Sequence, residues 1–463
     1  MTEAELQVQE LIARSRAAQK KIEGYTQEQV DALVKVCGRT IYDNAEMLAQ
    51  EAVEEGGLGN VPSKITKMQA GMTTAYQFLK GKKSVGVIRV DEDLHVVNYA
   101  KPMGVVACIT PSTNPTSTVG GNGMYALKCR DSVIFAPHPR TKACTLHAVE
   151  LVREALRNAG APEDLFLCIE APTMESTQAL MAQADVVVAT GGPGMVKAAY
   201  SSGRPSYGVG QGNVQVIVDT DCRGEYDTIA EAVTNSRIRD NGVPCSCEQF
   251  ITCPQEDGPA FLDALRRAGA WVIEDEEVAQ KLRGLLFRQN DDGSYAFNVS
   301  SVGIPAVELA RRIDLDVSPN TKTLVVPVKA VAQAELLCKE KLCPVQAFAT
   351  YETFDQGMEQ ILANLHMEGA GHTAVIFSHT QAHLDQAGRA LPVSRIIVNA
   401  AGGTAGGATL SNGLTPTLSL GCGSWGNNSI SENLSYTHLM NVTKMAYTIP
   451  DAPQPSDEEI WAD

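Results

Sequence analysis

The pattern of apolar residues changes along the chain, and each pattern predicts a different kind of structure. Up to about residue 80, apolar residues recur at steps of three and four, as at Val30, Leu33 and Cys37, which predicts amphipathic helices. Between residues 84 and 100, valines alternate with other residues around a polar turn, which predicts a two-stranded ribbon. Two strands are not stable alone, so this ribbon needs a neighbour with which to pair.

After the ribbon, short apolar runs alternate with helical stretches, which is the pattern of parallel βαβ units. The first group of predicted strands comprises residues 105–109, 133–136, 165–169, 186–189 and 214–218. The second group comprises residues 250–253, 271–273, 323–326, 374–377 and 396–398. The predicted fold class is therefore α/β, with two doubly wound domains that meet near residue 221.

Composition excludes several classes of function. The 463 residues carry a formal net charge of -16 without a cluster of Lys and Arg, so we expect no nucleic-acid partner. No window is apolar enough for a membrane span, and the charged, amphipathic N-terminus is unlike a secretion signal. The twelve cysteines show no disulfide spacing, so we expect reduced thiols and a cytoplasmic protein without a membrane partner.

A glycine-rich turn follows one of the predicted strands. Residues 189–194 read Ala-Thr-Gly-Gly-Pro-Gly and stand between an apolar run and a helical stretch. Glycines at such a place let the backbone approach a phosphate at a helix N-terminus. The spacing departs from G-x-G-x-x-G, and turns of this kind are about as often plain tight turns as phosphate sites. The segment alone leaves both readings open.

Cys245 stands in a turn-rich segment, Asp-Asn-Gly-Val-Pro-Cys, just before a predicted strand. Such a loop can present a thiolate, which is the form of cysteine that attacks a carbonyl. In a chain with twelve cysteines, however, an arbitrary one is more often a small core residue. Cys245, Cys247 and Cys253 lack the paired spacing of a zinc site, so we expect no metal. His138 and His372 lie in loop-like contexts that indicate no role by themselves.

Six segments together resemble the CoA-acylating branch of the aldehyde dehydrogenase family. This branch includes the CoA-dependent succinate semialdehyde dehydrogenases and the acetaldehyde dehydrogenase half of the aldehyde-alcohol dehydrogenases. The resemblance runs over nearly the whole chain and implies an aldehyde dehydrogenase-like fold. The segments are 111–116 (PSTNPT), 136–140 (APHPR), 189–200 (ATGGPGMVKAAY), 241–245 (NGVPC), 368–373 (EGAGHT) and 420–426 (LGCGSWG).

The resemblance implies a catalytic role for three residues. Cys245 would attack the aldehyde, and the Asn114 amide would hold the oxyanion together with the Cys245 backbone N–H. Collapse of this thiohemiacetal would expel a hydride. His372 matches a family histidine near the acyl and CoA site.

The same resemblance implies a binding site for NAD or NADP. The residues implied to contact this cofactor are Thr110, Pro111, His138, Gly191, Gly194, Gly210 and Glu340. Gly191 and Gly194 would approach the pyrophosphate, His138 the adenosine ribose and Glu340 the nicotinamide ribose. Neither cofactor is excluded, because residues 138–141 contain no acidic side chain that would repel a 2′-phosphate.

One departure from the hydrolytic members of the family bears on the acyl acceptor. Those enzymes carry Glu-Leu-Gly-Gly, whose glutamate activates the deacylating water, whereas residues 208–211 here read Gly-Val-Gly-Gln. Without this general base, water is a poor acceptor, and coenzyme A is implied as co-substrate. Gln211 stands where the acylating branch usually has proline. The alternatives are a hydrolytic enzyme with another carboxylate near the thioester and a non-catalytic scaffold with this fold.

The resemblance also implies a division of the chain into functional regions. Residues 1–83 and 101–220 would bind the dinucleotide, and residues 221–430 would carry the nucleophilic cysteine. Residues 84–100 and 431–463 would form a small β oligomerisation element, so we expect a homodimer or homotetramer.

The substrate is implied only as a small aldehyde that reacts with CoA. Succinate semialdehyde, acetaldehyde and sulfoacetaldehyde all fit the resemblance. Arg237 and Arg239 could pair with a substrate carboxylate or sulfonate, although exposed arginines on a helix are more often solvated or salt-bridged. The physiological direction is also open, because exchange of one thioester for another is readily reversible.

Overall fold

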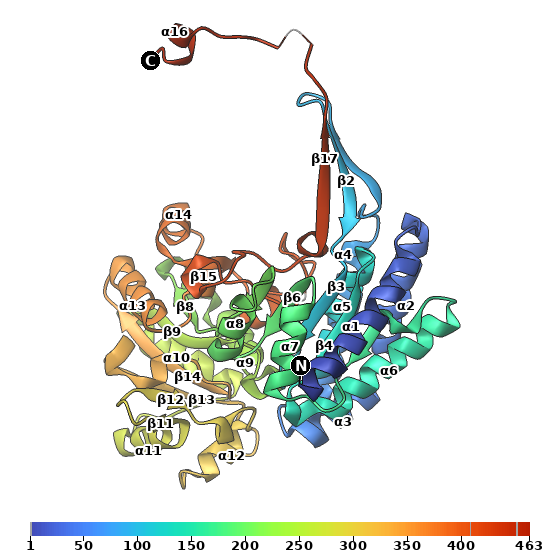
Figure 1. Cartoon of the computed structure of the whole chain (residues 1–463). Helices are drawn as coiled ribbons and strands as arrows, with labels where there is room; N and C mark the ends of the chain where they lie inside the picture. Colours follow the sequence, from blue (N-terminus) through green and yellow to red (C-terminus); the bar gives the residue numbers. More distant parts are fainter. Residues whose placement is uncertain (1, 408, 451) are drawn as a thin grey trace.

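The computed structural model describes residues 2–407, 409–450 and 452–463 (Figure 1). It has two α/β regions, one around a five-stranded sheet and one around a seven-stranded sheet. A three-stranded ribbon projects from them, and the C-terminal segment continues beyond the ribbon.

Four helices precede the first strand, as the apolar periodicity predicts. They are α1 (Glu3–Ile22), α2 (Gln27–Asp43), α3 (Ala45–Gly56) and α4 (Val61–Leu79). Thr2 and Thr26 begin α1 and α2 with capping boxes, in which the threonine side chain accepts from the backbone N–H three residues later. Cys37 and Ile41 of α2 are fully buried in the core beneath these helices.

The first sheet is parallel, in the order β5-β4-β3-β6-β7. Its strands are β3 (Val105–Ile109), β4 (Ser132–Ala136), β5 (Phe166–Cys168), β6 (Val186–Thr190) and β7 (Ser206–Val209). Its helices are α5 (Pro115–Lys128), α6 (Lys142–Asn158), α7 (Met174–Gln183) and α8 (Pro193–Tyr200). The chain runs outward from β3 to β5 and then returns to place β6 on the other side of β3. Ligands of open α/β sheets bind beyond the carboxyl ends of the strands at such a switch point.

The second sheet is also parallel, in the order β10-β13-β14-β9-β8-β15-β16. Its strands are β8 (Val214–Val218), β9 (Glu248–Pro254), β10 (Ala270–Val272), β13 (Thr323–Pro327), β14 (Val345–Tyr351), β15 (Gly371–Phe377) and β16 (Val393–Val398). The helices of this region are α9 (Tyr226–Arg237), α10 (Gly258–Ala268), α11 (Glu276–Leu286), α12 (Ala306–Arg311), α13 (Phe354–Met367), α14 (Gln381–Ala390) and α15 (Gly402–Ala405). A separate hairpin comprises β11 (Phe287–Gln289) and β12 (Tyr295–Phe297). Val216 and Ile217 of β8 belong to different apolar clusters, so both faces of the sheet are covered.

Three strands of the two parallel sheets differ from the sequence prediction, and the hairpin of β11 and β12 is not predicted. The sequence pattern assigns residues 214–218 to the first sheet, but β8 pairs with β9 and β15 in the second. This assignment is wrong because a strand that is buried on both faces suits the interior of either sheet, and only its pairing distinguishes them. β7 and β14 are missing from the predicted strands. β7 has four residues and includes Gly208, and the apolar run of β14 is interrupted by Gln346 and Thr350.

The ribbon is an antiparallel sheet in the order β1-β2-β17. β1 (Gly86–Asp91) and β2 (Val96–Pro102) form the predicted hairpin, and β17 (Met440–Ala446) pairs with β2 over its full length. The chain then continues to the short helix α16 (Asp457–Ile460), away from both α/β regions (Figure 1). Several apolar side chains of the ribbon are exposed, namely Val87, Val90, Val442 and Met445. A projecting sheet of this kind suits an oligomerisation element, which stays a prediction.

Two further features bear on the predicted class of protein. No helix in residues 2–407, 409–450 and 452–463 combines the length and the apolar character that a bilayer span requires. All twelve cysteines lie in this described part of the chain and each is free. Eleven are buried, and Cys245 is only partly buried.

Candidate active site

The residues predicted to be catalytic come from the carboxyl edge of the first sheet and the amino edge of the second. Cys245 precedes β9, and His372 is the second residue of β15. Asn114 follows β3 and is the N-cap residue of α5. Residues 210–213 connect the carboxyl end of β7 to the amino end of β8, so this short linker joins the two edges.

Cys245 and His372 are in direct contact. Nε2 of His372 lies 3.1 Å from Sγ of Cys245, and Nδ1 lies 2.9 Å from Oγ1 of Thr373. When Nδ1–H donates to this hydroxyl, Nε2 is left to accept the thiol proton. His372 is fully buried, and burial, with the nearby charge of Arg395, holds its pKa well below the usual 6.5. A neutral imidazole beside a thiol can act as the general base for a nucleophile.

The groups around Cys245 act on its thiol in opposite directions. Burial is the largest cause that raises the pKa of Cys245, and Glu340 and Cys422 add to it, whereas Arg395 lowers it. Burial, followed by the charge of Glu368, raises the pKa of Glu340 to about 8. Glu340 is therefore mostly protonated at pH 7 and gives little repulsion to a thiolate.

Two glycines of the segment 208–212 are closely packed, and one of them lies against the cysteine loop. An added Cβ at Gly212 would lie 2.2 Å from the carbonyl oxygen of Cys245, so a larger residue cannot fit there. An added Cβ at Gly208 would lie 2.7 Å from Cγ1 of Val196, within the packing of α8 against β7. Position 208 therefore carries no side chain and has little room for one.

Glu340 and Glu368 are held by the same segment. The Gly212 N–H donates to Oε1 of Glu340 at 3.1 Å, and Nε2 of Gln211 donates to Oε1 of Glu368 at 2.8 Å. Lys339 also pairs with Glu368, at 2.7 Å. Gln211 thus has a structural task in this chain, because it anchors the carboxylate that neighbours Glu340.

Asn114 carries an amide without a structural task. Its side chain makes no cap bond to α5, and its Nδ2 has one weak contact, 3.5 Å from Oγ1 of Thr113. Its Oδ1 is buried and has no hydrogen-bond partner among the described residues. An unsatisfied amide at the edge of a site is available to a ligand.

Four residues predicted to bind the dinucleotide gather at the switch point of the first sheet. Thr110 and Pro111 follow β3, and Gly191 and Gly194 lie between the neighbouring strand β6 and the body of α8. Oγ1 of Thr110 is buried without a partner in the described part of the chain, and an added Cβ at Gly194 would meet no atom within 4 Å. A free hydroxyl and an open backbone at a helix N-terminus fit a pyrophosphate.

The other predicted cofactor residues lie on either side of this turn. His138 follows β4 and is exposed, and its Nδ1 accepts from the Arg140 N–H at 3.1 Å. Gly210 lies on the cysteine side, where an added Cβ would lie 3.8 Å from Sγ of Cys422. His138, Gly210 and Glu340 therefore lie at different points between the first sheet and Cys245.

A buried ionic cluster that the sequence patterns do not predict joins the segments that carry Asn114 and Cys245. Nζ of Lys64 and Nζ of Lys67, both on α4, lie 2.9 and 2.6 Å from Oδ2 of Asp240. Lys64 also donates to the carbonyl of Thr113 at 3.2 Å. Asp240 lies in the loop that leads to Cys245 and has a positive φ of 48°. The spacing of the two lysines, one helical turn apart, is the only trace of this cluster in the sequence.

We expect Asp240→Asn to lower the free energy of unfolding by about 3 kcal/mol at pH 7, because it leaves two buried cations without a counter-charge. Burial, as the largest cause, already lowers the pKa of Lys67 to about 8 against the opposing charge of Asp240. At pH 9 Lys67 is mostly neutral, so the loss should be smaller there. Urea unfolding at both pH values measures this.

Asp227→Asn is the matched control for this variant. It removes an exposed carboxylate that pairs with Arg267 at 2.6 Å, so we expect a loss below about 1 kcal/mol. Equal losses in the two variants would contradict the role of the buried cluster.

Arg237 is buried, which contradicts the expectation of an exposed side chain. It follows Ile229 and Val233 at steps of four along α9 and therefore lies on the same buried face. Its Nη2 donates to two backbone carbonyls that precede β14. Arg239 is partly buried and donates to the Gly403 carbonyl.

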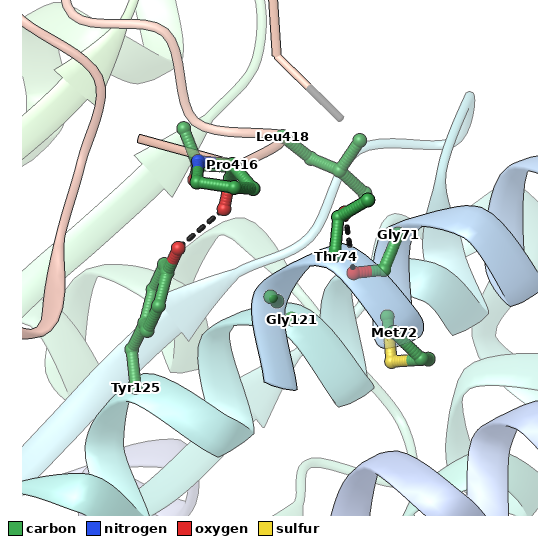
Figure 2. Close-up of a pocket in the computed structure, with 9 residues that line it drawn as sticks. Gly71, Met72, Thr74, Gly121, Tyr125, Pro416 and Leu418 are labelled. Carbon is green, nitrogen blue, oxygen red and sulfur yellow. Dashed lines mark hydrogen bonds between the residues drawn. The ribbon is translucent and has the colours of Figure 1, made fainter. Parts of the chain in front are cut away.

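Two cavities lie near these segments. The smaller, of about 10 Å³, is enclosed by α4, α5 and residues 416–418, where Tyr125 donates to the Pro416 carbonyl (Figure 2). It holds about one water molecule, so it is no aldehyde site. The larger is an open cleft of about 520 Å³ that borders the cysteine loop at Asn241. Its charged lining residues are Arg239 and Lys322.

The family model described as the aldehyde dehydrogenase family matches residues 2–281. The chain belongs to this family. A succinate-semialdehyde dehydrogenase (acetylating) from Clostridium kluyveri is 46% identical over 457 residues, which cover 99% of each chain. A sulfoacetaldehyde dehydrogenase from Acholeplasma is 39% identical over 455 residues, which cover 98% of this chain and 93% of the relative.

A solved structure extends the likeness to three dimensions. An acetylating aldehyde dehydrogenase from Geobacillus thermoglucosidasius superposes with a TM-score of 0.92 at 35% identity and covers 98% of this chain and 99% of its own. The predicted α/β aldehyde dehydrogenase-like fold and the predicted resemblance to the acylating branch are therefore confirmed. So is the predicted enzyme class, an oxidoreductase that acts on aldehydes.

Proposed function

We propose that the chain is a CoA-acylating aldehyde dehydrogenase, which reversibly converts a short-chain aldehyde, CoA and NAD or NADP into an acyl-CoA and the reduced cofactor. The observation that carries this proposal is the 3.1 Å contact between Nε2 of His372 and Sγ of Cys245. It pairs a nucleophile with a base at the meeting edges of the two sheets, in a chain whose relatives include acetylating enzymes.

The reaction begins when Sγ of Cys245 attacks the aldehyde carbon and His372 accepts the thiol proton. The Asn114 amide and the Cys245 backbone N–H donate to the oxyanion that forms. The nicotinamide ring supplies the hydride acceptor when it is bound. The acyl group then remains on Sγ as a thioester. His372 releases its first proton to solvent. The CoA thiol then attacks the thioester while His372 takes its proton, acyl-CoA is released, and the departing Cys245 thiolate takes this proton back.

The cofactor site in this proposal extends from the first sheet to Cys245. Gly191 and Gly194 would hold the pyrophosphate, together with Thr110 and Pro111 at the switch point. His138 would lie at the adenosine ribose, with Gly210 and Glu340 toward the nicotinamide end. The free hydroxyl of Thr110 supports this assignment.

The hydrolytic alternative is disfavoured by the carboxyl groups near the site. Gly208 supplies none, and Glu340 is bound by the Gly212 N–H and has its pKa raised to about 8. A protonated carboxyl cannot take a proton from water, so the thioester is left for the CoA thiol. We therefore expect little turnover without CoA at pH 7.

For the aldehyde we propose a short substrate with an anionic end, such as succinate semialdehyde or sulfoacetaldehyde. Two relatives support this, because their names specify succinate semialdehyde and sulfoacetaldehyde, both of which carry an anionic group. We also propose that subunits associate through the ribbon, as a homodimer or homotetramer.

The test is the reduction of NAD and of NADP by the purified protein with succinate semialdehyde, sulfoacetaldehyde and acetaldehyde, each with and without CoA. We expect turnover only with CoA, and a kcat/KM for an anionic aldehyde at least about tenfold above that for acetaldehyde, which corresponds to one charge-assisted contact. CoA-independent turnover would favour the hydrolytic alternative. A preference for acetaldehyde would refute the anionic substrate.

A further inference from the structure

A buried arginine stands behind the catalytic pair. Arg395 is the third residue of β16 and is only 4% exposed. β16 pairs in parallel with β15 so that Arg395 lies opposite Thr373, the residue that follows His372 and contacts its ring. The pairing of two strands, rather than any sequence motif, thus brings a guanidinium to the site.

The guanidinium of Arg395 forms a hydrogen bond that holds it in place, but some of its N–H donors have no partner. Its Nη2 donates to the carbonyl of Gly421, whereas its Nε and Nη1 are buried without a hydrogen-bond partner among the described residues. The segment after Gly421 closes over β15, since an added Cβ at Gly371 would lie 1.8 Å from the carbonyl oxygen of Cys422. Arg395 therefore lies between the strand that carries His372 and the segment that carries Cys422.

This buried cation lacks the partner that a buried arginine usually has. In residues 2–407, 409–450 and 452–463, no carboxylate forms an ion pair with Arg395. The positive charge of Arg395 is stabilised by Cys422 and by Cys245 when their thiols are deprotonated. A buried charge without a permanent counter-ion stabilises an anion that forms beside it.

We propose that Arg395 is a positioning residue whose fixed positive charge stabilises the thiolate of Cys245, before its attack on the aldehyde and again when CoA displaces it. The other groups that face Cys245 carry little charge at pH 7. His372 is neutral, Glu340 is mostly protonated, and Cys422 and Cys247 are thiols whose pKa is raised by burial. Arg395 thus carries the permanent positive charge that acts on Cys245. This inference rests on the proposal that Cys245 is the nucleophile.

The test is the pH dependence of alkylation of Cys245 by iodoacetamide, which reacts with the thiolate and needs neither substrate nor cofactor. Mass spectrometry of the Cys245 peptide separates this residue from the eleven buried cysteines. In Arg395→Gln, which keeps a donor for the Gly421 carbonyl but removes the charge, we expect the midpoint to rise by about one to two pH units. In Arg395→Lys, which keeps the charge, we expect a rise below about half a unit.

Turnover provides a second readout. At pH 7.5 the Arg395→Gln enzyme should be slower by about tenfold or more, with the difference shrinking as the pH rises toward the new midpoint. Arg130→Gln is the matched control, because Arg130 is also buried and donates to backbone carbonyls, those of Glu23 and Ala100. It should leave the alkylation profile unchanged.

An alkylation midpoint that is the same in wild type and Arg395→Gln would overturn the inference, even if turnover falls. So would an Arg395→Lys midpoint that rises as far as that of Arg395→Gln, and this comparison decides if the glutamine variant does not fold. Failure of the proposal that Cys245 is the nucleophile gives a different result: the alkylation midpoint would still shift, but Cys245→Ala would retain CoA-dependent turnover.

Discussion

The Cys245→Ala enzyme is expected to lose CoA-dependent aldehyde oxidation by at least about 10⁴-fold in kcat/KM, the scale on which removal of a covalent nucleophile acts. Alanine has no atom that can attack the aldehyde, so the tetrahedral thiohemiacetal that releases the hydride cannot form. The measurement is reduced cofactor formed per minute at saturating CoA, with folding checked by circular dichroism.

Cys247→Ala is the control for this variant. Cys247 is two residues away in the same loop, but it is buried and its thiol donates to the Ser236 carbonyl at 3.0 Å. Its loss should change kcat/KM by less than about threefold and cost mainly stability, as for other small core residues. If Cys245→Ala keeps its activity, or if the two variants lose activity equally, Cys245 is not the nucleophile.

Much of the fold follows from periodicity. Steps of three and four residues predict the four leading helices, and alternating apolar runs predict the strands of two parallel sheets. The sheet to which a strand belongs does not follow from such patterns. β8 is mostly apolar and buried throughout, so it suits either sheet. Its place between β9 and β15 depends on contacts with strands that lie more than thirty residues away in the chain.

The site is predictable only where a motif carries it. The resemblance points to Cys245 and His372, which the structure places 3.1 Å apart. Arg395 and the Lys64–Asp240–Lys67 cluster have no such motif, because each depends on a register or a helix face that brings distant residues together. Arg395 is one residue in an ordinary strand, and only the parallel pairing with β15 makes it a neighbour of the catalytic pair.

His372→Gln is expected to lower kcat/KM by about 10²- to 10³-fold at pH 7, within the range that general-base catalysis contributes. Glutamine can hydrogen-bond the thiol but cannot take its proton, so Cys245 must lose that proton to solvent. The activity of the variant should therefore rise with pH toward the pKa of the thiol. Thr373→Val, which removes the partner of Nδ1 at 2.9 Å but leaves the ring, should cost only about tenfold.

The pH profile and the first turnover together show where His372 acts. Because burial holds the pKa of His372 well below 6.5, wild-type kcat/KM should show no inflection centred near pH 6.5. An inflection centred there would mean that the ring titrates at its ordinary pKa and that its neutral form is the active one. In His372→Gln without CoA, a slowed first turnover of cofactor reduction would place the base at the attack of Cys245. A rapid first turnover followed by slow CoA-dependent cycles would place it at the CoA thiol. Full activity in both phases would remove His372 from the mechanism, since no other neutral base contacts Sγ among the described residues.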